Sequence, residues 1–199
     1  GHEAADREKL LGIMEMDAHF FNTDHEKRIA LDAARKIFNR ITVNELSQKL
    51  HAMRVPIRYA EQVRSMDNDY LRMIVFNHRP SLEKTFPEFI KAMNRLWGRR
   101  QDFRVWIPYY PKKQRSYEWL FTEVPITDRD KYYYGLRRSY FGVSPAQKFG
   151  HWSASTADGL LNGVPYIMYD ADYYRELNPN ADFYRNQTGL LELANLYLD

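Results

Sequence analysis

The stretch LRMIVFNHRPSLEKTFPEFIKAMNRLWGRRQDFRVWI, residues 71–107, places two apolar segments on either side of an amphipathic one. Residues 71–77 and 103–107 are short apolar runs typical of buried strands. Over 81–97 the apolar residues recur at three- and four-residue steps, which predicts a helix with Phe86, Phe89, Ile90, Met93 and Leu96 on its buried face. Gly98 and the charged turn after it end this helix. A parallel sheet is built from this alternation.

The same alternation continues toward the end of the chain. We expect a short strand within 119–122, a helix over 128–139 capped at Thr127 and Asp128, a strand over 140–144, a helix over 155–162 ending at Gly163, a strand over 164–169 and a helix over 190–198. Upstream, 16–22 is a predicted strand, and Thr23 or Asp24 caps a helix that runs to Phe38. The sequence therefore predicts an α/β domain with a doubly wound, Rossmann-like parallel sheet.

Composition excludes several kinds of protein. The 199 residues include no cysteine, so disulfides, cysteine-ligated metals and thiol nucleophiles are absent. No apolar run approaches the ~20 residues that cross a bilayer, and the first residues have no secretory pattern, so we expect a cytoplasmic protein. The net charge of +3, from 29 basic and 26 acidic residues, is too small to identify a nucleic-acid binder, and it does not exclude one.

Arg79 and Lys84 follow the predicted strand at 71–77. Ligands of such sheets bind at the carboxyl ends of the strands. The helix dipole disfavours cations in the first turn of a helix, so two of them there call for an anionic partner, such as a pyrophosphate. The alternative is a solvated arginine and lysine on a surface turn.

A second stretch, FGHWSASTADGLLNGVPYIMYD at 149–170, has features of a phosphate site. Gly150 allows a ligand to approach the backbone, and the N–H groups near Ser153, Ser155 and Thr156 open a helix that could receive phosphate oxygens. Asp158 lies near the start of that helix, where a carboxylate can accept hydrogen bonds from a ribose diol. Simple stabilisation of the helix start is the alternative for Asp158.

Together these segments resemble the C-terminal, donor-binding domain of a GT-B glycosyltransferase, especially the retaining type. The pattern of that type is R-x4-K after one strand and E-x-F-G-x4-E-A-x3-G-x-P further on. Arg79 and Lys84 match the first part, and residues 158–165, DGLLNGVP, match the end of the second with aspartate for glutamate. Residues 126–145 are similar to the family's segment of acidic cap, helix, strand and Pro-Ser turn. The resemblance covers about residues 71–199.

The resemblance implies roles at the matching positions. Arg79 and Lys84 would bind the donor's diphosphate and offset the charge on the leaving nucleotide. Asp158 would hold the ribose, Ser153 to Thr156 would approach the phosphates or the sugar, and backbone around Val124 would meet the base. The partner is a nucleotide diphosphate sugar, and the family requires neither a metal nor another cofactor.

One departure from the pattern affects the sugar subsite. The family's first glutamate falls at Gly150, and His151 and Trp152 occupy the adjacent positions. The identity of the sugar and the retaining or inverting outcome therefore stay open. His78, beside Arg79, is a further candidate for a donor contact, with simple packing as its alternative.

The same resemblance suggests a domain organisation. Residues 1–65 would hold the end of the acceptor-side domain and a linker, and 66–199 the nucleotide-sugar domain, with 16–38 similar to the last strand and helix of the former. The chain begins and ends in mid-element, so we expect a piece of a longer enzyme that is inactive alone. The acceptor is open, with modified DNA, glycan, lipid and protein as the choices.

Other patterns in the sequence are weaker indications of function. Asp170 and Asp172 form a D-x-D that follows a strand late in the domain, which favours a turn over a metal site, and the histidines lack paired ligand spacing, so we expect no metal. The tyrosines at 132–134 are expected on a half-buried helix face. Two other functions stay open: a nucleotide- or phosphosugar-binding module without transfer chemistry, and a nucleic-acid-binding protein.

Overall fold

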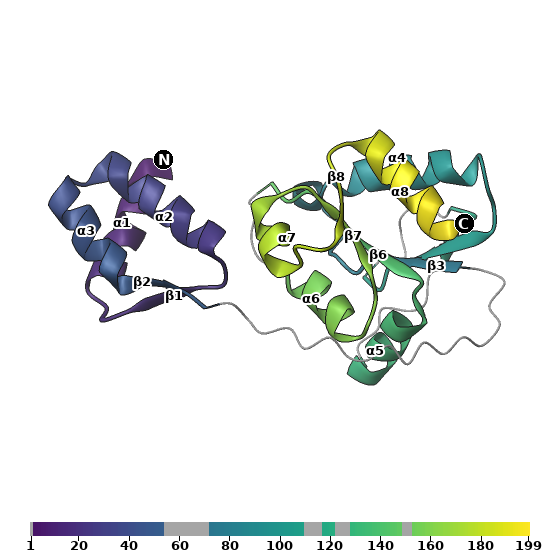
Figure 1. The fold of residues 1–199 in the computed structure, drawn as a ribbon, viewed down its shortest axis with the longest axis horizontal. Coiled ribbons are helices and arrows are strands. Elements are labelled where there is room, and N and C mark those ends of the chain that lie inside the picture. Colours follow the sequence, from purple (N-terminus) through teal and green to yellow (C-terminus); the bar gives the residue numbers. More distant parts are fainter. Residues whose placement is uncertain (1, 54–71, 110–116, 122–127, 149–152) are drawn as a thin grey trace. The chain divides into compact units, whose positions relative to one another are not determined.

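The computed structural model describes residues 2–53, 72–109, 117–121, 128–148 and 153–199. The chain divides into two compact units, Gly1–Pro56 and Ile57–Asp199 (Figure 1). The domain boundary predicted at 65–66 lies outside the described residues and stays a prediction.

The first unit is a small layer of helices beside a two-stranded parallel sheet. Its elements are α1 (His2–Met14), β1 (His19–Phe21), α2 (Asp24–Ile37), α3 (Arg40–Lys49) and β2 (Leu50–Ala52). Thr23 caps α2, because its side chain accepts a hydrogen bond from the Glu26 N–H at 3.1 Å. The sequence predicted β1 and α2, and it missed α1, α3 and β2.

The second unit contains a parallel sheet of six strands in the order β5-β4-β3-β6-β7-β8. The strands are β3 (Arg72–Val75), β4 (Phe103–Trp106), β5 (Leu120–Phe121), β6 (Phe141–Ser144), β7 (Tyr166–Tyr169) and β8 (Asp182–Tyr184). This order confirms the predicted doubly wound α/β class. Only β8 was not expected.

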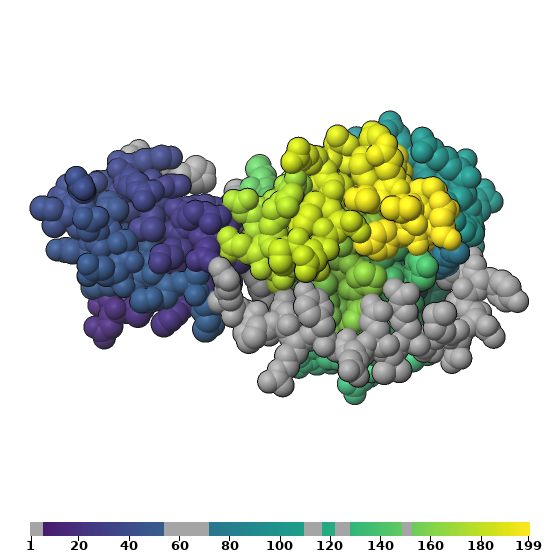
Figure 2. Space-filling model, in the orientation of Figure 1, coloured from purple at the N-terminus to yellow at the C-terminus, as the bar shows by residue number. Residues whose placement is uncertain are grey.

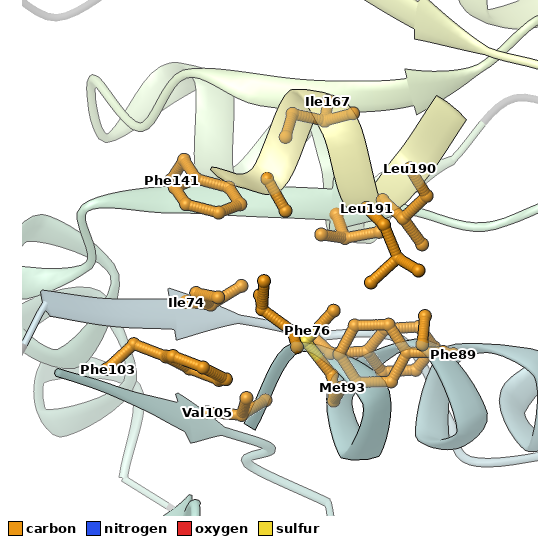
Figure 3. Packing of buried hydrophobic residues seen from close by; sticks show 14 of the residues in the cluster. Ile74, Phe76, Phe89, Met93, Phe103, Val105, Phe141, Ile167, Leu190 and Leu191 are labelled. Atoms are coloured by element: carbon orange, nitrogen blue, oxygen red, sulfur yellow. The ribbon is translucent and has the colours of Figure 1, made fainter. Parts of the chain in front are cut away.

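Helices cover both faces of this sheet (Figure 1). The helices α4 (Phe86–Trp97) and α8 (Gln187–Leu198) pack on one face, where Ile74, Phe89 and Leu190 share a core (Figure 3). On the other face lie α5 (Arg129–Arg138), α6 (Ala154–Leu161) and α7 (Asp172–Leu177), which pack on Val75, Trp106, Tyr166 and Met168. In Figure 2, α8 lies beside α4 on the surface. The strand residues alternate between the two cores, as a sheet covered on both faces requires.

The helix predicted over 81–97 is interrupted. A 3-10 turn, η1 (Leu82–Lys84), comes first, and Thr85 then adopts a left-handed conformation with φ of 44° before α4 begins at Phe86. Pro87 lacks an N–H and fits only the first turn of a helix, so α4 has to begin beside it. Lys84 therefore lies in the turn ahead of α4, and its predicted place in the first turn of the α-helix was wrong.

Candidate donor-binding site

We use the word crevice for the space next to the carboxyl ends of β3 and β6, where the order of the strands reverses. From β3 the chain passes through α4 to β4 on one side, and after α5 it returns to β6 on the other side of β3. Parallel sheets bind ligands at such a topological switch point. Residues 76–84 leave the end of β3, and 145–148 leave the end of β6. Both predicted cations, Arg79 and Lys84, belong to the first of these segments.

Arg79 and Lys84 differ in how they are held. The Arg79 side chain is 75% exposed, with Nη2 3.3 Å from Oε2 of Glu83. Lys84 is half-buried, and its ammonium donates a hydrogen bond to Oε1 of Gln147. Burial lowers the pKa of Lys84; nearby Glu83 opposes this effect, and Arg79 adds to it. One cation is thus open to solvent and the other is held in the wall of the crevice.

Hydrogen bonds join the turn after β3 to the loop after β6, residue by residue. The Lys148 N–H donates to the Glu83 carbonyl at 2.9 Å, and the Thr85 hydroxyl donates to the Ala146 carbonyl at 3.3 Å. The contact between Lys84 and Gln147 lies between them. These three hydrogen bonds stabilise the unusual backbone conformation of Thr85, a β-branched residue at positive φ.

His78 lies beneath the crevice in a buried polar cluster. Its Nε2 is 3.3 Å from Oγ1 of Thr156, which is also 2.7 Å from Oγ of Ser144 and donates to Oγ of Ser153 at 3.1 Å. Burial, with a smaller effect of nearby Lys84, lowers the pKa of His78 to about 3. The imidazole is therefore neutral at neutral pH. A neutral imidazole can donate to Thr156 or accept from it, depending on which ring nitrogen carries the hydrogen.

The start of α6 faces the same edge of the sheet. Ser153 is buried and caps the helix by accepting from the Thr156 N–H at 3.2 Å. Among the described residues, the N–H groups of Ala154 and Ser155 have no protein acceptor. These two N–H groups are the donors that an anion at the crevice would meet. The side chains of Ser153 and Thr156 instead hold the protein together.

Asp158 lies within α6, half-buried, with tyrosines and an arginine around it. Burial is the largest influence and raises the pKa of its carboxyl, while Arg129 and a hydrogen bond with Tyr132 oppose the rise. Burial raises the pKa of Tyr109, and the negative charge of Asp158 adds to this effect. Tyr109 follows the carboxyl end of β4 and is 47% exposed.

Sequence reasoning missed Asn77 and Gln147. Asn77 is fully buried; its Nδ2 donates to the Tyr132 hydroxyl at 2.9 Å and to the Ser155 carbonyl at 2.6 Å, and its Oδ1 accepts from the Tyr166 hydroxyl at 2.9 Å. The signal that could have revealed Asn77 was a polar residue that ends an apolar run without a turn. Asn77 joins the end of β3 to α5, α6 and β7.

The other expected residues have mixed outcomes. Gly150, His151, Trp152 and Val124 lie outside the described residues and stay predictions. Of the tyrosine run, Tyr132 is buried and Tyr134 is exposed, as a half-buried helix face requires. Asp170 accepts from Arg175 at 2.6 Å and from Arg185 at 2.7 Å, and these bonds lower its pKa to about 2.

The described part of the chain offers neither a metal site nor a membrane helix. It holds no group of His, Asp or Glu side chains that could bind a metal ion. No helix in that part has the length and apolar character to cross a membrane.

No protein-family model matches the chain, and no curated protein sequence matches it. Among solved structures, a UDP-forming α,α-trehalose-phosphate synthase from Burkholderia xenovorans superimposes with a TM-score of 0.72 at 13% identity, over 97% of this chain and 56% of that one. The fold is that of GT-B glycosyltransferases. A trehalose-6-phosphate synthase studied for glycosyltransfer with retention superimposes with a TM-score of 0.70 at 10% identity, over 95% of this chain and 54% of the synthase.

A further GT-B match is TarM, with a TM-score of 0.64 at 12% identity, over 98% of this chain and 38% of TarM. The chain thus spans about half the length of the synthases that it resembles. The shared GT-B fold agrees with the resemblance drawn from the motifs.

Proposed function

We propose that this chain is the donor-binding part of a glycosyltransferase, which transfers a sugar from a nucleotide diphosphate sugar to an acceptor. One observation carries the proposal: Arg79 and Lys84 lie with the open N–H groups of α6 at the topological switch point of a GT-B fold. Positive groups from two separate elements there suit a diphosphate. One of the similar structures is a UDP-forming synthase, which supports the same chemistry.

The proposed roles follow from charge. When the acceptor oxygen bonds to the anomeric carbon, the bond from that carbon to the diphosphate oxygen breaks, the oxygen keeps the electron pair, and the acceptor loses its proton. Arg79 and Lys84 would stabilise the negative charge that develops on the diphosphate, a large effect when the groups are already in place. The proposal assigns this charge compensation to the two side chains, without a required metal.

We propose the remaining subsites from the positions of residues in the family pattern. Asp158 would bind the ribose hydroxyls, with backbone around Val124 at the base, and Gly150, His151 and Trp152 near the sugar. The intact enzyme would be cytoplasmic and would close a second domain over the donor. This chain alone would bind the donor weakly and would turn over nothing, and its acceptor is unassigned.

Calorimetric titration with UDP, GDP, ADP and dTDP tests the proposal. We expect selective binding of one diphosphate, weakened about tenfold or more by Arg79→Ala and by Asp158→Asn. Arg99→Ala, the same change at an exposed arginine at the end of α4, is the matched control and should bind as the wild type does. Absence of binding in the wild type would contradict the proposal.

Two other results would favour the alternatives. Affinity that ignores the base and falls steeply with salt would indicate a nucleic-acid-binding protein. Selective nucleotide binding without sugar transfer by the full-length protein would indicate a binding module.

A further inference from the structure

Gln147 is the protein partner of Lys84 in the crevice. The Lys84 ammonium donates to Oε1 of Gln147, a residue that is only 9% exposed. A buried amide must satisfy its hydrogen bonds within the protein. In the described part of the chain no carboxylate forms an ion pair with Lys84, so a neutral group holds this cation.

The Tyr174 hydroxyl fixes the orientation of the Gln147 amide. Its Nε2 donates to the Tyr174 hydroxyl at 2.9 Å, and that hydroxyl donates its proton to the Pro145 carbonyl at 3.0 Å. The Pro145 carbonyl can only accept, so the Tyr174 oxygen must accept from Gln147. Tyr174 is completely buried, and burial raises its pKa, so it keeps this proton. The amide oxygen therefore has to face Lys84.

The charges around Lys84 leave the site positive. Glu83 is the nearest acid, and its carboxylate is shared with Arg79 at 3.3 Å. Lys148 is exposed on the loop after β6, and His78 is neutral. Gln147 thus fixes the ammonium by a hydrogen bond without cancelling its charge, whereas a glutamate there would cancel it.

We propose that Gln147 is a positioning residue, which holds the Lys84 ammonium, still uncompensated, against the diphosphate of the donor. The chain Pro145, Tyr174, Gln147 and Lys84 connects α7 and the loop after β6 to the cation. This inference rests on the proposed function and deepens it, because it adds a neutral residue on which the affinity for the diphosphate depends.

A double-mutant cycle with inorganic pyrophosphate as the probe tests this role. Binding is followed by NMR titration into the millimolar range for the wild type, Gln147→Met, Lys84→Met and the double variant. We expect Gln147→Met to weaken binding about tenfold in the wild-type background and to change it less than twofold when Lys84 is already Met. Gln101→Met, the same change at an exposed glutamine, is the control and should have no effect.

The outcomes separate the inference from the proposed function. The same tenfold loss in both backgrounds would indicate a merely structural role and overturn the inference, as would a wild type that binds pyrophosphate and a Gln147→Met variant that binds it equally well. Failure of the wild type to bind pyrophosphate and every nucleoside diphosphate would overturn the proposed function, and the inference with it.

Gln147→Glu provides a second readout that needs no ligand. It preserves shape while adding a charge that should raise the pKa of Lys84, observed by NMR of the ammonium, and weaken pyrophosphate binding. If this variant changes neither quantity, the inference is overturned even where Gln147→Met fails to fold.

Discussion

Nε2 of His78 lies 3.3 Å from Oγ1 of Thr156, inside the carboxyl edge of the sheet. The contact joins the segment after β3 to α6, and both residues are almost completely buried. Burial keeps the imidazole neutral, so the cluster is stable only while His78 stays unprotonated.

Acid should therefore destabilise the protein through His78. Its pKa is about 3 when folded, against an ordinary value of 6.5. Between these values the unfolded chain binds a proton that the folded chain does not, so stability is complete above the unfolded pKa and falls as the pH decreases. From pH 7 to pH 5 we expect a loss of about 2 kcal/mol from this group in denaturant unfolding.

His78→Gln isolates that contribution, since glutamine keeps a donor near Thr156 and does not titrate. Between pH 7 and pH 5 the variant should lose about 2 kcal/mol less unfolding free energy than the wild type loses. Identical pH dependence in the two proteins would show that His78 is not held neutral.

Gly159 should not tolerate a methyl group. It stands at the alanine position of the GT-B pattern, and a Cβ there would fall within the Tyr166 ring. Gly159→Ala should lower the free energy of unfolding by roughly 1–3 kcal/mol, as measured by urea denaturation. Tyr166→Leu should recover part of the loss that Gly159→Ala causes.

Gly12→Ala is the matched control. A Cβ at Gly12 would meet nothing within 4 Å, and α1 should gain up to ~1 kcal/mol of stability from it. A Gly159→Ala variant as stable as the wild type would mean that the ring moves aside freely.

The strands of the sheet could be predicted from the sequence where they are buried on both faces. Val75, Val105 and Ile167 lie in short apolar runs, which are typical of strands buried on both faces of a sheet. By contrast, β8 (Asp182–Tyr184) is an edge strand with only Tyr184 buried, so it has no apolar run to reveal it.

Charge alone was enough to propose Arg79 and Lys84 as site residues, and their roles stay predictions. The sequence did not reveal the neutral polar residues that act through distant contacts. Asn77 and Tyr166 are 89 positions apart, and Lys84 and Gln147 are 63 positions apart. Such pairs have no local spacing, and only the parallel sheet brings them together.

Asn77 should be the costliest buried polar residue of the site to replace. Asn77→Leu would leave the Tyr166 hydroxyl, the Tyr132 hydroxyl and the Ser155 carbonyl without this partner. Buried polar groups left unpaired cost about 1–3 kcal/mol each, so we expect a loss of roughly 3 kcal/mol or more in unfolding free energy. Tyr132→Phe removes a single hydroxyl and should cost only about 1 kcal/mol. Equal losses in the two variants would contradict the central place of Asn77.

Glu83→Gln should strengthen diphosphate binding. The Glu83 carboxylate lies 3.3 Å from Arg79, and it is the acid that opposes the lowered pKa of Lys84. Its removal frees the guanidinium and leaves the crevice more positive, so the affinity for pyrophosphate should rise about two- to fivefold, which is the range of exposed ion pairs. Stability should change little, because the pair is exposed.

Calorimetric titration with pyrophosphate checks the expected rise in affinity. Glu88→Gln is the control, because Glu88 is exposed in the first turn of α4. Weaker binding by Glu83→Gln would show that Glu83 holds Arg79 in its productive place and does not compete for it.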